Sequence, residues 1–126
     1  FNKMSIDAAI RHKIEVRNPV ALRSIVFLDQ INEFVNSACL PDQVPPGIYN
    51  IGNWGGAISE LAAIIADCWG AEVSVLGESD CYSFRLDSSK AESVCPNFSG
   101  RMTSEQLSLR SKALVARVTA GDVNDE

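Results

Sequence analysis

The sequence IYNIGNWGGAISELAAIIADCWG, residues 48–70, decides the fold class of this 126-residue chain. Its first four residues form a short β-prone run that leads into a group of three glycines. The apolar side chains that follow recur at helical spacing: Ile58, Leu61, Ala62, Ile65 and Trp69. Gly70 suits the left-handed position that ends many helices. The stretch therefore predicts a strand over 48–51, a glycine turn and a helix over 58–69.

Strand-like and helix-like segments alternate on both sides of this stretch. Further β-prone runs cover residues 13–17, 22–28, 72–76 and 83–86. Further helical patterns cover residues 2–11, 29–38, 88–94 and 103–117. Because helices connect the strands, we expect an α/β fold with short, mostly parallel strands and about five helices. Residues 1–118 would form this folded portion, and residues 119–126 would form an acidic tail.

Polar residues mark the starts of three of the predicted helices. Asp29 and Asp87 are candidate N-caps, because a short carboxylate side chain accepts hydrogen bonds from the first free N–H groups of a helix. Thr103 and Gln106 have the spacing of a capping box, in which each side chain accepts from the backbone of the other residue. These signals set the expected helix starts.

Acidic residues outnumber basic ones in this chain. Sixteen Asp and Glu against eleven Lys and Arg give a net charge of −5. Long-range attraction to a phosphate backbone or to anionic lipid needs a positive protein surface, so we expect neither nucleic acid nor a membrane as a partner. No apolar run approaches the roughly 20 residues that cross a bilayer.

The sequence offers no complete set of catalytic or metal-binding residues. The four cysteines, at positions 39, 68, 81 and 95, form no C-x-x-C pair, and His12 is the only histidine, so we expect neither a zinc site nor a Ser-His-Asp triad. Neither tyrosine has a lysine four residues later, which removes the Tyr-x-x-x-Lys pair of one oxidoreductase class. We predict free thiols in a reducing, cytoplasmic compartment.

The glycines at positions 52, 55 and 56 do not complete a dinucleotide-binding loop. In the G-x-G-x-x-G pattern the middle glycine lets a pyrophosphate approach the backbone, but here Trp54 holds that position and Ala57 the last one. Because an indole would fill the space that the phosphate needs, we expect no cofactor-binding residue and no NAD binding by this chain alone. The glycines are interpreted as a tight turn, and a simple anion site at the following helix N-terminus is the alternative.

Three segments, taken in order, carry a resemblance to a known family. Residues 23–31, RSIVFLDQI, are similar to the run Arg-Asp-Phe-Val-His-Val-x-Asp-Val, and residues 47–52, GIYNIG, resemble a strand Gly-x-Tyr-Asn-hydrophobic-Gly. Residues 87–90, DSSK, match a segment Asp-x-Ser-Lys. Together they resemble the C-terminal half of the extended short-chain dehydrogenase/reductase family, the NAD-dependent nucleotide-sugar epimerases and dehydratases. The resemblance spans residues 4–114.

The resemblance implies the C-terminal, substrate-binding part of an extended Rossmann-type oxidoreductase, with a small molecule such as a nucleotide-sugar as its ligand. In that family the cofactor loop and the Tyr-x-x-x-Lys pair lie upstream, in an N-terminal Rossmann domain that binds NAD or NADP, and neither motif occurs here. The chain begins with Phe1 rather than Met, so we expect a fragment that lacks this domain and is inactive alone.

The resemblance also implies three substrate-binding residues. Arg23 matches the family arginine that contacts the diphosphate of the nucleotide-sugar, which a planar guanidinium suits. Asp80 lies where the family has an acid that binds the nucleotide ribose. The arginine of that same pattern falls on Gly77, and Arg85 could replace its charge if its side chain points into the cleft.

Two other functions stay open at this point. One is a non-catalytic module that binds a small molecule or a nucleotide-sugar. The other is a protein-interaction domain in which Trp54 and Trp69 contact a partner through exposed apolar surface.

Overall fold

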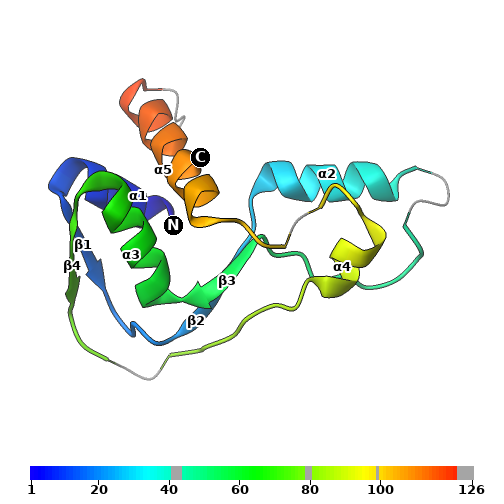
Figure 1. Ribbon diagram of the computed structural model, residues 1–126, viewed down its shortest axis with the longest axis horizontal. Helices are drawn as coiled ribbons and strands as arrows, with labels where there is room; N and C mark the ends of the chain where they lie inside the picture. The colour runs from blue at the N-terminus through cyan, green and yellow to red at the C-terminus, as the bar shows by residue number, and fades with distance from the viewer. Residues whose placement is uncertain (41–43, 79–80, 99, 122–126) are drawn as a thin grey trace. The chain divides into compact units, whose positions relative to one another are not determined.

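The computed structural model describes residues 1–40, 44–78, 81–98 and 100–121 (Figure 1). Within this part, the chain forms two compact units. The first unit is built from Phe1–Ala21, Ala57–Tyr82 and the segment that starts at Thr103, and the second from Leu22–Gly56 and Ser83–Met102. Each unit is therefore assembled from segments that lie far apart in the sequence.

The first unit combines two parallel strands with three helices. β1 (Lys13–Val16) and β4 (Glu72–Val75) pair in parallel, with Ile14 opposite Val73 and Val16 opposite Val75. α1 (Asn2–Arg11), α3 (Ile58–Trp69) and α5 (Ser104–Thr119) contact one another, and both α1 and α3 contact β1. The helices and β1 enclose the buried core: Ala8, Ile14, Val16, Leu61, Ala62, Ile65, Leu107 and Val115.

Local sequence signals set the helix ends in this unit. α3 ends at Gly70, whose φ of 63° is the left-handed conformation that glycine adopts without strain. At the start of α5, the Thr103 hydroxyl accepts from the Gln106 N–H at 3.2 Å, and the Gln106 side chain accepts from the Thr103 N–H at 2.9 Å. The predicted glycine stop and the predicted capping box are both confirmed.

The second unit combines two short strands with two helices. β2 (Leu22–Ile25) and β3 (Trp54–Ala57) are hydrogen-bonded neighbours, and α2 (Leu28–Ala38) and α4 (Ser89–Val94) complete the unit. Its buried core consists of Phe34, Ala91, Cys95 and Phe98. The Phe34 and Phe98 rings meet edge to face, with centroids 5.7 Å apart. This core joins α2 to α4.

The α/β class and the five predicted helices are confirmed, with short parallel strands in the first unit. The second strand pair differs from the parallel expectation. Asn53 N–H donates to Ile25 O at 2.7 Å, and Ile58 N–H donates to Ala21 O at 3.0 Å. Because one partner advances along the chain while the other recedes, β2 and β3 run in opposite directions.

Two predicted strands are wrong, and each has a physical reason. At residues 48–51 the Ile48 carbonyl accepts from Lys90 Nζ at 2.9 Å, a side-chain bond in place of a strand partner. The strand forms later instead, over Trp54–Ala57, so the glycines that we interpreted as a turn lie largely inside β3.

The second wrong prediction is the strand over 83–86, which the structure shows as an extended segment beside β2 without a regular ladder. Phe84 N–H donates to Leu22 O at 3.2 Å. In two other hydrogen bonds between the segment and β2, a serine hydroxyl accepts in place of a backbone carbonyl. Leu22 N–H donates to Ser83 Oγ and Leu86 N–H donates to Ser24 Oγ, both at 2.8 Å. Side-chain bonds therefore hold this segment.

Candidate functional site

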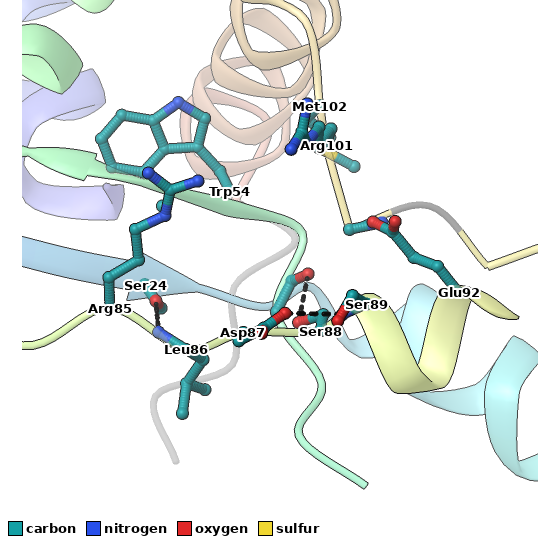
Figure 2. A pocket seen from close by; sticks show the side chains of 13 residues that line it. Ser24, Trp54, Arg85, Leu86, Asp87, Ser88, Ser89, Glu92, Arg101 and Met102 are labelled. Atoms are coloured by element: carbon teal, nitrogen blue, oxygen red, sulfur yellow. Dashed lines mark hydrogen bonds between the residues drawn. The ribbon is translucent and has the colours of Figure 1, made fainter.

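The second unit contains a pocket of about 580 Å³ (Figure 2). Its walls come from β2, from the residues that lead into β3, from the extended segment before α4, from α4 itself and from residues 100–102. The volume falls in the range of roughly 300–1,000 Å³ that is typical of small-molecule sites. Polar and charged side chains dominate the lining, including Arg85, Asp87, Glu92 and Arg101.

Arg85 enters this pocket from the extended segment beside β2. The bond from Leu86 N–H to Ser24 Oγ fixes the backbone next to it. Its aliphatic stem lies against Gly55, where an added Cβ would come within 3.0 Å of Arg85 Cγ. Among the described residues, no hydrogen bond or ion pair engages its guanidinium, although its charge acts on Asp87. The pocket therefore presents an available bidentate donor.

Asp87 contributes a carboxylate that is ionised at neutral pH. Asp87 Oδ1 accepts from the Ser89 N–H at 2.9 Å. This backbone hydrogen bond is the main reason why the pKa of Asp87 is lowered, and the Ser89 hydroxyl and the charge of Arg85 act in the same direction. The residue is exposed. The predicted N-cap is wrong by one residue: Ser88 is the N-cap of α4 and has no side-chain cap hydrogen bond, and Asp87 lies just before it.

Glu92 on α4 contributes the second carboxylate of the pocket. Its Oε1 accepts from the Gly100 N–H at 2.7 Å, and two residues further on the Met102 N–H donates to Asn53 O, also at 2.7 Å. These two bonds flank Arg101. The segment that carries Arg101 into the pocket is thus attached to α4 on one side and to the start of β3 on the other.

Asn53 is the buried residue that connects these walls, and the sequence analysis missed it. Its side chain is fully buried. Its backbone bonds to Ile25 and Met102, and its Oδ1 accepts from the Phe27 N–H at 3.0 Å. Phe27 is the N-cap residue of α2 and has no side-chain cap of its own, whereas the predicted cap Asp29 lies inside the first helical turn. The signal for Asn53 was its place beside the glycines, which we had interpreted only as a turn.

Of the two predicted substrate-binding residues that the structure describes, only one lines the pocket. Arg85 lines the pocket. Arg23 lies beside Ser24 on β2, but it is outside the lining, because successive side chains of a strand point to opposite faces. Its Nη1 donates to the Leu22 carbonyl at 2.8 Å. Asp80 lies outside the described residues.

The glycine-rich stretch does not fit a dinucleotide cofactor. Gly55 and Gly56 both belong to β3. This strand ends at Ala57 and α3 begins at Ile58, so no loop that could hold a phosphate separates them. Trp54, at the position where the cofactor pattern needs glycine, contributes its side chain to the pocket wall. These residues therefore do not form the phosphate-binding loop that NAD requires.

Two other kinds of functional feature, metal sites and membrane spans, were sought among the described residues. No group of three His, Cys, Asp or Glu side chains is placed to hold a metal ion within the described ranges. Over the same part of the chain, no helix has both the length and the apolar character that a membrane span requires.

No protein-family model and no curated protein matches the chain.

Proposed function

We propose that this chain is the substrate-binding portion of an NAD(P)-dependent nucleotide-sugar epimerase/dehydratase-like oxidoreductase, and that the pocket of the second unit binds the anionic part of the ligand. The cofactor, NAD or NADP, would belong to an N-terminal Rossmann domain outside this chain. The proposal includes a cytoplasmic location, for which the sequence argument is the reducing environment that free thiols need.

The observation that carries the proposal is the position of Arg85. The resemblance offered this residue as a replacement for a missing cationic phosphate clamp. Its guanidinium lines a pocket of suitable volume and has no hydrogen-bonding or ion-pair partner among the described residues. The nearby carboxylates already accept hydrogen bonds from Ser89 and Gly100, so part of their charge is compensated. A diphosphate matches this arrangement because a guanidinium donates two parallel hydrogen bonds to it.

The test is calorimetric titration of the chain with UDP-glucose and, separately, with inorganic pyrophosphate. Arg85→Ala should weaken binding of both by about 1.5–3 kcal/mol, the usual contribution of a hydrogen bond to a charged group. Arg85→Lys should recover only part, because an ammonium lacks the planar fork. Arg117→Ala, an exposed arginine on α5 in the first unit, is the matched control.

Arg23→Ala tests the prediction made from sequence. If Arg23 binds the diphosphate as the resemblance implies, its removal should weaken binding as strongly as removal of Arg85. If the pocket lining defines the site, Arg23→Ala should leave the affinity within about twofold of the wild type, because its Nη1 donates to the Leu22 carbonyl. Absence of saturable binding by the wild-type chain would refute the proposed function.

The alternative of a non-catalytic binding module would use the same pocket. It differs only in that no catalytic domain would act on the bound ligand. The interaction-domain alternative relied on Trp54 and Trp69. Trp69 Nε1 donates to the buried Ser111 Oγ at 2.8 Å between α3 and α5, and its side chain is half-buried. Because Trp69 already packs within the first unit, the small-molecule proposal is the one that the observations favour.

A further inference from the structure

The segment Gly100–Met102 is held over the pocket by a carboxylate. Gly100 N–H donates to Glu92 Oε1 at 2.7 Å, and this bond joins the segment to α4. The contact leaves no room at Gly100, because an added Cβ would overlap Glu92 Oε1 and would lie 3.2 Å from Ser88 Cβ. Only glycine lets the backbone approach the carboxylate this closely.

The negative charge of Glu92 does not by itself explain its place in a pocket that we propose binds an anion. Glu92 lines the same pocket as Arg85 and Arg101, so its negative charge opposes an anionic ligand. If charge were its only effect, removing it would strengthen anion binding. The hydrogen bond to Gly100 should instead favour anion binding. It fixes the backbone next to Arg101, whose guanidinium lines the pocket.

The backbone of Arg101 is fixed on both sides. Glu92 holds the amide before it, and the Asn53 carbonyl holds the amide after it, each at 2.7 Å. The residue that provides the second attachment, Asn53, is fully buried. The Glu92 attachment depends on one half-buried side chain on a six-residue helix. The Glu92 attachment is therefore the more exposed of the two.

We propose that Glu92 is a positioning residue for anion recognition: its carboxylate fastens Gly100 and thereby sets where the Arg101 guanidinium lies relative to Arg85. The inference rests on the proposed function, since it concerns the same pocket. In this role, what matters is that Glu92 accepts a hydrogen bond from Gly100, and its negative charge is not needed. An acceptor of the same shape without charge should therefore serve equally well.

The experiment compares Glu92→Ala with Glu92→Gln. Glutamine keeps a carbonyl oxygen that accepts from the Gly100 N–H, whereas alanine keeps none. We measure the affinity for inorganic pyrophosphate by calorimetry and the hydrogen exchange of the Gly100 amide by NMR. Glu92→Ala should weaken pyrophosphate binding by about 3- to 10-fold and remove the protection of the Gly100 amide. Glu92→Gln should retain both, with an affinity equal to or above that of the wild type.

Two further measurements separate the possible failures. Gly100→Ala should reproduce Glu92→Ala, because the added methyl group displaces the carboxylate. Glu78→Ala, an exposed carboxylate in the first unit, is the control for a change of net charge. If Glu92→Ala and Glu92→Gln both bind pyrophosphate more tightly, or both bind it more weakly to the same extent, the positioning role is refuted.

The exchange measurement needs no ligand, which distinguishes this inference from the proposed function. If the wild-type chain does not bind pyrophosphate, the proposed function fails and the anion-positioning role fails with it. If the wild type binds and the Gly100 amide stays equally protected in Glu92→Ala, only the positioning role fails. Melting curves of all variants show whether each one is folded.

Discussion

Replacing Asn53 by alanine should destabilise the second unit by about 2 kcal/mol. The change removes the acceptor that the Phe27 N–H uses at 3.0 Å, at the start of α2. Leaving a fully buried donor without its acceptor costs about 1–3 kcal/mol; the Phe27 bond is part-buried, whereas the Asn53 side chain is fully buried, which places the loss at about 2 kcal/mol. The contact from Asn53 Nδ2 to Gln30 Oε1 is 3.5 Å long, at the outer limit of hydrogen bonding, so it should add little.

Amide hydrogen exchange is the appropriate assay, because it reports on the second unit separately from the first. The amide of Cys95 bonds to Ala91 O within the core of this unit. A loss of about 2 kcal/mol should accelerate its exchange by roughly 30-fold when exchange proceeds through unfolding. Asn50→Ala, an exposed asparagine nearby, should change stability by no more than about 0.5 kcal/mol. Equal exchange rates in the two variants would refute the role that we assign to Asn53.

Three further predictions concern single positions. Gly55→Ala should push away the stem of Arg85, lowering pyrophosphate affinity several-fold while stability stays the same or rises by up to about 1 kcal/mol, as calorimetry and melting curves can check. Gly70→Ala should cost about 1–2 kcal/mol in urea unfolding, because the left-handed φ of 63° strains any residue with a Cβ. Ser89→Ala should raise the pKa of Asp87 part of the way towards its ordinary value in an NMR titration, since the backbone hydrogen bond remains. The stability that Asp87 contributes is present above its unfolded-state pKa and is lost as the pH falls through its lowered folded-state pKa. If the pKa of Asp87 does not move in Ser89→Ala, the Ser89 hydroxyl does not help to lower it.

The helices were predictable because their signals are local. The apolar spacing from Ile58 to Trp69, the glycine at position 70 and the Thr103–Gln106 box each act within a few residues. Local hydrogen bonds and periodic burial define a helix even before its tertiary contacts are known. The predicted bounds of α1 and α3 accordingly agree with the structure.

The strands of the second unit were less predictable because each depends on a partner elsewhere in the chain. Residues 48–51 have β-prone side chains, but Lys90 takes the carbonyl of Ile48. Trp54–Ala57 contains two glycines, which weaken intrinsic strand preference, yet it pairs with β2. What decides between the two segments is the pairing that begins at Asn53 and Ile25, and no pattern within either segment encodes it.

The candidate site shows the same limit more strongly. Arg85 was a sequence-level candidate because a family pattern drew attention to a missing charge, but its direction depends on Gly55 and Ser24, which approach it from two other segments. In the sequence, Glu92 could be considered only as an acid–base partner of Asp87, and no pattern assigned it a binding role. Its importance follows from one contact with Gly100, where an added Cβ would displace the neighbouring carboxylate and no left-handed backbone angle calls for glycine. A glycine of this kind resembles any loop glycine in the sequence. The variants Glu92→Gln and Gly100→Ala are therefore the changes that test whether this contact, rather than the charge of the pocket alone, controls the anion binding that we propose.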